Sequence, residues 1–241
     1  MPIIGLYYVG TEKSRGFPLH MKVLSGKRRC AQMKGTIICI GRQYGSGGRE
    51  IGEKLAKNLG VVCCDKLLIR QAAKDSGLSA DIIENDEERP IGLCEVVSGN
   101  PFADSALLGA TFYSEKQRVF EAESKAILKI AEKGPCIIIG RCASSILRGA
   151  GYDVLSVFVY ADMDDRAKRI AERNGIGIKE AIRKAEKVDR MRKKYFDFYS
   201  DTPWGEHASY DLMISSSRYG IDGTADVIGK AVADKIRGDA K

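Results

Sequence analysis

The sequence lacks several features by which common classes of protein are recognised. No apolar run approaches about 18 residues, so we expect no transmembrane helix. The apolar stretch at the beginning carries its charges after it instead of before it, which argues against a secretory signal. The two histidines, His20 and His207, are far apart and have neither metal-ligand spacing nor a paired nucleophile, so we assign them no chemistry.

Cysteine is present, but it forms no recognisable pattern. The seven cysteines are an odd number, and no regular spacing pairs them as a disulfide framework or as a C-x-x-C zinc site. Cys63 and Cys64 are adjacent and are therefore poorly placed to bond to each other. We expect all seven to be reduced thiols in a reducing compartment, which predicts a cytoplasmic location.

The composition is ordinary for a globular protein, with 44% apolar and 29% charged residues, and the length favours one α/β domain. A formal net charge of +7 raises the question of a polyanionic partner: nucleic acid, anionic lipid or a phosphorylated small molecule. Outside the first 34 residues the basic residues are interspersed with acids, which is typical of a solvated surface. No aromatic-rich basic motif or helix-turn-helix signature occurs, so nucleic acid is the weakest of these candidates.

The beginning of the chain differs from the remainder. Residues 1–34 are aperiodic and contain several glycines and prolines, so we expect an appendage that is poorly ordered and packs little against the rest. Two interpretations stay open: Met33 is the natural start, or the segment is a short structured arm. Residues 35–241 then form the main domain.

Five short apolar runs predict buried strands, and helical patterns separate them, with a further helix-rich acidic stretch at 81–89. Continuous apolar runs suit strands that are covered on both faces, and helical crossovers between strands indicate a parallel sheet with helices on both sides. We therefore expect an α/β fold of three layers around one five-stranded parallel sheet. The predicted strands are residues 36–41, 61–64, 136–141, 154–161 and 210–215.

A glycine-rich segment, GSGG at 45–48, lies between the first predicted strand and an amphipathic helix. In this context glycines let backbone N–H groups turn inward on phosphate oxygens at a helix N-terminus. The spacing departs from the signature G-x-x-x-x-G-K-[ST]. With Gly47 as the second glycine, Arg42, Gly48 and Arg49 occupy the first glycine, the lysine and the following residue. A phosphate cradle is the preferred interpretation, and a simple tight turn is the alternative.

The stretch GRQYGSGGREIGEKLAKNLG, followed by VVCCDKLLI, resembles the opening of the cytidylate kinase-like family. Later segments agree with that family in order: IIIGRCA, VFVYADMDDRAKRI, VDRMRKKYFDFY and WGEHASYDLMISSS. The resemblance covers the chain from about Gly35 to Arg237. It implies a P-loop NTPase fold with a helical lid at about 164–200, an ATP- and Mg²⁺-dependent phosphotransferase, and a nucleoside monophosphate, first of all cytidylate, as acceptor.

The resemblance also implies residues that bind the phosphate donor. In the related kinases a loop lysine bridges the β and γ phosphates and a nearby hydroxyl binds magnesium, and this chain has Gly48 and Glu50 in their place. The guanidinium groups of Arg42 and Arg49 are available for phosphate oxygens, and Glu50 is the candidate Mg²⁺ ligand. The alternative is that Arg49 and Glu50 are ordinary surface residues. The candidate ATP-binding residues are Arg42, Gly45, Ser46, Gly47, Gly48, Arg49 and Glu50.

Acceptor-binding residues are implied in the same way. Asp65 and Arg141 each follow a predicted strand, and by resemblance they face the acceptor, as does Asp189 from the lid. Asp65 is an equally good candidate for a helix N-cap, and the alternative for Arg141 is a surface ion pair.

Phosphoryl transfer needs positive charge over the transferring oxygens and the exclusion of water. The candidate catalytic cations are Arg49 on the loop and Arg166 and Arg192 on the charged helices of the lid. The alternative is that these helices are solvated faces. Trp204, the only tryptophan, is expected to anchor its turn on the core, with stacking on a base as the alternative.

Three functions follow in order of preference. The first is an ATP-dependent nucleoside monophosphate kinase. The second is a nucleotide-binding P-loop protein with little or no kinase activity, which is suggested by glycine in the lysine position. The third, suggested only by net charge and the basic beginning of the chain, is a nucleic-acid-binding protein.

Overall fold

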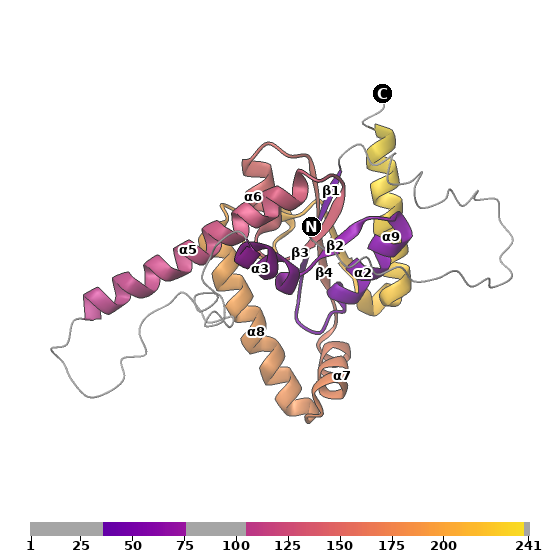
Figure 1. Ribbon diagram of the computed structural model, residues 1–241. Helices are drawn as coiled ribbons and strands as arrows, with labels where there is room; N and C mark the ends of the chain where they lie inside the picture. Colours follow the sequence, from indigo (N-terminus) through magenta and orange to yellow (C-terminus); the bar gives the residue numbers. More distant parts are fainter. Residues whose placement is uncertain (1–35, 76–104, 239–241) are drawn as a thin grey trace, which may run out of the picture.

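The computed structural model describes residues 36–75 and 105–238, and it contains a five-stranded sheet in which every neighbouring pair of strands is parallel. The strand order is β2-β3-β1-β4-β5, which places β1 in the centre (Figure 1). The strands are β1 (Ile37–Arg42), β2 (Val62–Cys64), β3 (Cys136–Ile139), β4 (Val154–Tyr160) and β5 (Leu212–Ser215).

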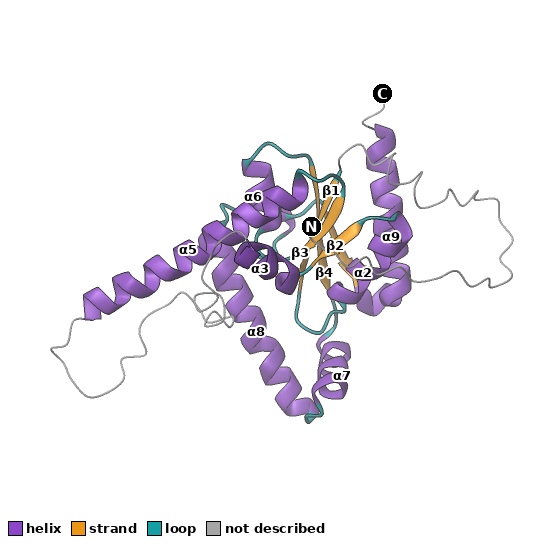
Figure 2. Ribbon diagram, in the orientation of Figure 1, coloured by secondary structure: helices purple, strands orange, loops and turns teal. Residues whose placement is uncertain are grey.

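Helices connect the strands and cover both faces of the sheet (Figure 2). Their bounds are α2 (Gly48–Leu59), α3 (Lys66–Asp75), α5 (Ser105–Ala131), α6 (Ala143–Gly149), α7 (Met163–Asn174), α8 (Ile178–Tyr199) and α9 (Ser216–Gly238), with a short 3₁₀ helix η1 (His207–Ser209).

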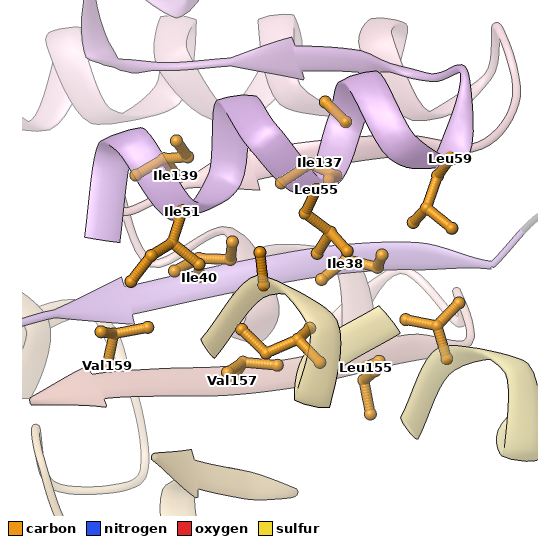
Figure 3. Close-up of a cluster of buried hydrophobic side chains, with 14 of the residues drawn as sticks. Ile38, Ile40, Ile51, Leu55, Leu59, Ile137, Ile139, Leu155, Val157 and Val159 are labelled. Atoms are coloured by element: carbon orange, nitrogen blue, oxygen red, sulfur yellow. The ribbon is translucent and has the colours of Figure 1, made fainter. Parts of the chain in front are cut away.

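The side chains of β1 alternate between two hydrophobic clusters, as the period of a strand requires. Ile38 and Ile40 point to the face covered by α2 and α9, where they pack with Ile51 and Leu55 of α2 (Figure 3). Ile37 and Cys39 point to the opposite face, which is covered by α3, α5 and α6. Because both faces of β1 are buried, the central strand reads in the sequence as an unbroken apolar run.

The predicted three-layer α/β fold with one parallel sheet is confirmed, and the five predicted strands coincide with the observed ones to within two residues at each end. The expected appendage at residues 1–34 and the acidic helical stretch at 81–89 lie outside the described residues. Among the helices that the structure describes, none combines the length and the apolar character needed to cross a membrane.

Helices α7 and α8 form a hairpin beyond the carboxyl edge of the sheet, in the range expected for a lid (Figure 1). The two helices share a small core of their own, in which Ala167 and Ile170 of α7 pack against Ala181 and Ala185 of α8. Tyr44, from the loop after β1, packs against this core. The hairpin is therefore anchored on the glycine-rich loop.

Candidate active site

The glycine-rich loop joins β1 to α2 at the carboxyl edge of the sheet. Gly45 and Gly47 have φ values of 82° and 78°, in the left-handed region that glycine tolerates without strain. A Cβ on Gly47 would also overlap Ile221 Cδ1 of α9. Since α2 begins at Gly48, directly after this turn, the first N–H groups of the helix lie at the end of the loop, where an anion is favoured.

Side chains and strands around the loop fix its path. Ser46 Oγ donates to the carbonyl of Gln43 at 2.9 Å, and Ser216 Oγ at the start of α9 donates to the carbonyl of Ser46 at 2.6 Å. The Gln43 N–H donates to Val159 O of β4 at 3.0 Å, and Gln43 Oε1 accepts from Ala161 N at 3.1 Å. The Ser46 hydroxyl is thus used in shaping the loop.

The α7–α8 hairpin holds both polar groups of one loop residue. Asp189 Oδ1 accepts from Tyr44 N at 2.7 Å, and Arg166 Nε donates to Tyr44 O at 2.8 Å. Arg166 and Asp189 also form an ion pair with each other, and Arg166 is only 4% exposed. Two predicted site residues therefore meet as a clamp on the loop backbone.

Burial raises the pKa of the Asp189 carboxyl above its ordinary value. The Tyr44 N–H and the guanidinium groups of Arg166 and Arg192 act in the opposite direction and favour the charged form. Removing any of these donors would therefore leave a half-buried carboxylate with less compensation.

A pocket lies between the ends of β1 and β3 on one side and α8 on the other. Three predicted site residues line it, Arg42, Arg141 and Arg192, and Lys66 adds a fourth cation. Arg192 also donates from Nη1 to the carbonyl of Arg42 at 3.1 Å, which ties α8 to the end of β1. The aromatic part of the lining consists of Tyr195, Phe196, Trp204 and Tyr210. The pocket thus combines clustered positive charge with flat apolar surfaces.

Arg141 is held by a buried carboxylate that the sequence did not reveal. Glu123 of α5 is 1% exposed; its Oε2 lies 3.4 Å from Arg141 Nη1, and its Oε1 lies 3.4 Å from Arg70 Nε. Tyr195 Oη donates to Glu123 Oε2 at 3.2 Å, and the Arg141 guanidinium lies 5.3 Å from the centre of the Tyr195 ring. Burial raises the pKa of Tyr195, so its hydroxyl keeps its proton and remains a donor. Arg141 takes part in an ion pair while it also lines the pocket.

Arg49 and Glu50 lie in the first turn of α2 with 60% of each side chain exposed. Arg49 pairs with Glu53 at 2.9 Å and with Asp65 at 3.1 Å, and it is not among the residues that line the pocket. Glu50 lies 3.9 Å from Lys54. Arg141 and Arg192 therefore meet at one pocket, whereas Arg49 points elsewhere.

Asp65 is the N-cap of α3. Its Oδ1 accepts from Leu67 N at 3.0 Å and from Leu68 N at 3.1 Å, while Oδ2 faces Arg49. Of the two roles that the sequence left open for Asp65, this geometry supports capping. Trp204 packs edge-on against Phe158, with ring centres 5.2 Å apart, so it anchors its turn on the core while one part of it lines the pocket.

A bound metal would find few protein ligands here. Among the described residues there is no group of three or more His, Cys, Asp or Glu side chains that could hold a metal ion. Mg²⁺ commonly takes only one or two carboxylates and fills its other positions with phosphate oxygens and water. An exposed carboxylate on the loop helix, that of Glu50, therefore fits a magnesium ion that arrives with a polyphosphate, but it does not fit a preformed protein cage.

The strand order, the glycine loop between β1 and α2, and the cationic pocket at the carboxyl edge together define a P-loop NTPase fold of the kinase type. The family model of the cytidylate kinase-like family matches residues 37–218, and the chain belongs to this family. All five strands, the loop and both charged helices lie inside the matched range, which ends at the beginning of α9.

Individual relatives agree with this assignment. The cytidylate kinase of Thermococcus sibiricus is 33% identical over 209 residues, which cover 86% of this chain and 92% of the relative. The cytidylate kinase of Methanopyrus kandleri is 25% identical over 207 residues, 82% of this chain and 93% of the relative. Among solved structures, an uncharacterized protein from Eubacterium ventriosum is 30% identical with a TM-score of 0.64, over 83% of this chain and 99% of that one.

Proposed function

We propose that this protein transfers the γ-phosphoryl group of ATP to the phosphate of a nucleoside monophosphate, and that cytidylate is the first acceptor to test. The observation that carries the proposal is that Arg42, Arg141 and Arg192, from three separate segments, line one pocket, and that Arg42 also lies against Gly48, the first residue of α2. Transfer between two phosphate groups requires this kind of clustered positive charge. The cytidylate kinases among the relatives support the choice of acceptor.

The reaction requires little covalent chemistry from the protein. An oxygen of the acceptor phosphate forms a bond to the γ-phosphorus, and the bond from that phosphorus to the β–γ bridging oxygen breaks. ADP leaves with the electron pair, and because the nucleophile is already an oxyanion, no general base is needed. The protein therefore contributes by positioning the two phosphates and by compensating their charge.

The arginines divide this work by position. Arg141, fixed by Glu123, would hold the acceptor phosphate, and Arg192, which reaches the pocket from α8, would act on the transferring oxygens. The backbone N–H groups at the start of α2 would bind donor phosphates. Arg166 and Asp189 would act through the loop backbone, as positioning residues.

Mg²⁺ would accompany ATP, with Glu50 as the loop carboxylate within the first turn of α2. Such an ion supplies charge neutralisation on the polyphosphate when bound. The residues of the protein would have to orient the nucleotide and keep water away. The anchored α7–α8 hairpin is suited to that task because it packs against the loop at Tyr44.

The test is a release assay for ADP with ATP, Mg²⁺ and each of the nucleoside monophosphates in turn. We expect ADP release that depends on the acceptor and is greatest with cytidylate. Release of ADP at the same rate without any acceptor would contradict a kinase and indicate simple hydrolysis. Transfer to a different monophosphate would keep the reaction and change the substrate.

A second candidate is a nucleotide-binding protein without appreciable turnover. The observation in its favour is glycine at position 48, where kinases with the common signature carry a lysine. Binding of ATP with no transfer to any monophosphate would favour this candidate over the first.

A further inference from the structure

The space that a side chain at position 48 would need is already filled. A Cβ built on Gly48 would lie 2.8 Å from Cβ of Arg42 and 3.2 Å from both its Cγ and its Cδ. Carbon atoms in proteins approach no closer than about 3.5 Å at optimal contact, so even an alanine at 48 would need Arg42 to move. The side chain of Arg42 therefore occupies the space that the side chain of a lysine at position 48 would need.

The far end of Arg42 points from the loop toward the acceptor side of the pocket. A Cβ built on Gly140, the residue before Arg141, would lie 2.5 Å from Arg42 Nη1. The guanidinium therefore sits against the turn that follows β3, while its stem crosses the first residue of α2. Arg192 fixes the backbone at the root of this side chain through its bond to Arg42 O.

We propose that Arg42 supplies the cation that a lysine at position 48 supplies in the common loop, and that residue 48 is glycine because the Arg42 stem occupies its side-chain space. The proposal rests on the proposed function only in taking ATP as the ligand. It makes Arg42 the residue that bridges the donor phosphates and the acceptor side of the pocket. The altered loop is then an exchange of positions between the cation and the glycine, with no loss of charge.

The exchange also changes the kind of contact. A guanidinium is a planar fork that can bind two phosphate oxygens at once, whereas an ammonium group acts as a point charge. Arg42 is the last residue of β1, before the loop, whereas a lysine at 48 would be the first residue of α2, after it. An arginine from this side spans from the donor loop to Gly140, next to the proposed acceptor ligand Arg141.

The test is a reciprocal exchange of the two residues, in the full chain. Arg42→Gly together with Gly48→Lys recreates the common spacing, with glycine at 42 and 47 and lysine at 48. Binding of ATP with Mg²⁺, and of inorganic tripolyphosphate, is measured by calorimetry for the wild type, both single variants and the double variant. Gly177→Ala, at a site with open space, and Arg190→Ala, an exposed arginine of α8, are the matched controls.

We expect each single exchange to weaken binding by about 10- to 100-fold, the usual cost of losing a hydrogen bond to a charged group. The double exchange should recover most of that loss, because removing the stem of Arg42 makes room for the lysine that Gly48→Lys introduces. Both controls should bind as the wild type does. A double variant whose loss equals the product of the two single losses would overturn the proposal.

Because the Gly48→Lys variant can fail to fold for other reasons, a second pair of variants tests the steric link with a smaller change. Gly48→Ala adds only the Cβ, so it should weaken binding, whereas adding it to Arg42→Gly should cause no further loss. Thermal unfolding of every variant separates binding from folding. Equal effects of Gly48→Ala in both backgrounds would overturn the steric link.

The proposed function and the exchange of residues 42 and 48 are tested by different measurements, phosphate transfer for the first and binding for the second. A wild type that binds ATP but transfers phosphate to no monophosphate would refute the kinase, while the exchange of residues 42 and 48 would still be decided by binding. A wild type that binds neither ATP nor tripolyphosphate would overturn both.

Discussion

The glycine-rich loop, which is the proposed donor side, and the pocket around Arg141, which is the proposed acceptor side, hold their functional groups in different ways. On the donor side, the α7–α8 hairpin is hydrogen-bonded to the main chain of the loop at Tyr44, while the side chains of Arg49 and Glu50 remain exposed. On the acceptor side, the side chain of Arg141 is held by an ion pair with Glu123, which is almost completely buried.

The difference follows from the kind of donor that each side would present to a phosphate: backbone N–H groups on the loop, and a side-chain guanidinium at Arg141. A loop that binds through backbone N–H groups must fix its backbone, because those donors cannot move independently of it. A guanidinium on a long side chain must have its rotamers fixed, which a buried charged partner does well. The comparison predicts that substitutions around Arg141 act on side-chain position and stability, and those around Tyr44 act on donor binding.

The largest effect is expected for Glu123→Gln. This change leaves Arg70 and Arg141 without their buried counter-charge, and breaking a buried pair in this way costs about 3–5 kcal/mol. Urea unfolding should show the loss, and KM for the acceptor should rise while KM for ATP changes less. Glu121→Gln, on the same helix but exposed, is the control. A loss below about 1 kcal/mol would indicate that Glu123 does not support Arg141.

A somewhat smaller effect is expected for Arg166→Ala. The change removes the donor to Tyr44 O and leaves the Asp189 carboxylate with one fewer compensating cation. Because the loop backbone would lose its fixed path, we expect ATP to bind about 10- to 100-fold more weakly. Lys168→Ala, exposed on the same helix, should bind ATP normally. If the acceptor KM rises in Arg166→Ala and ATP binding does not change, the assignment of the hairpin to the donor side is wrong.

Arg141→Ala and Arg192→Ala test the division within the pocket. Loss of Arg141 should raise KM for the acceptor by about 10-fold or more, since it removes a charged contact to the acceptor phosphate. Loss of Arg192 should mainly lower kcat, as expected for a group that acts on the transition state. Steady-state kinetics with varied acceptor separates the two, and unchanged kinetics in both variants would remove both residues from the mechanism.

The smallest effect is expected for Arg49→Ala. Its ion pairs with Glu53 and Asp65 lie at a surface where 60% of the Arg49 side chain is exposed, and such pairs contribute about 0–1 kcal/mol. Stability and acceptor KM should therefore change little. A drop in kcat of about 100-fold would restore Arg49 to the catalytic role suggested by its place in the sequence.

The sheet could be predicted from the sequence because the inner strands β1, β3 and β4 are buried on both faces and so appear as apolar runs, and the edge strands β2 and β5 are short apolar runs although they are less buried. The role of Glu123 could not be predicted, since an acid in a helix is usually solvated. Only the fold reveals that Glu123 lies against Arg70 and Arg141. Asp65 carried two possible roles because the same position, just after a strand, suits both a ligand and a cap. The relation between Arg42 and Gly48 was hidden for another reason: it depends on the path of a side chain across a turn.

The contact between the loop and α9 bears on the order in which the protein is made. Ser216 donates to the carbonyl of Ser46, although the two residues are 170 positions apart. At about 5–20 residues per second, a ribosome needs on the order of 10 to 30 s to pass from one to the other. Until then the loop lacks both this bond and the contact of Ile221 with Gly47. A nascent chain would therefore complete its glycine-rich loop only after most of the domain has been translated.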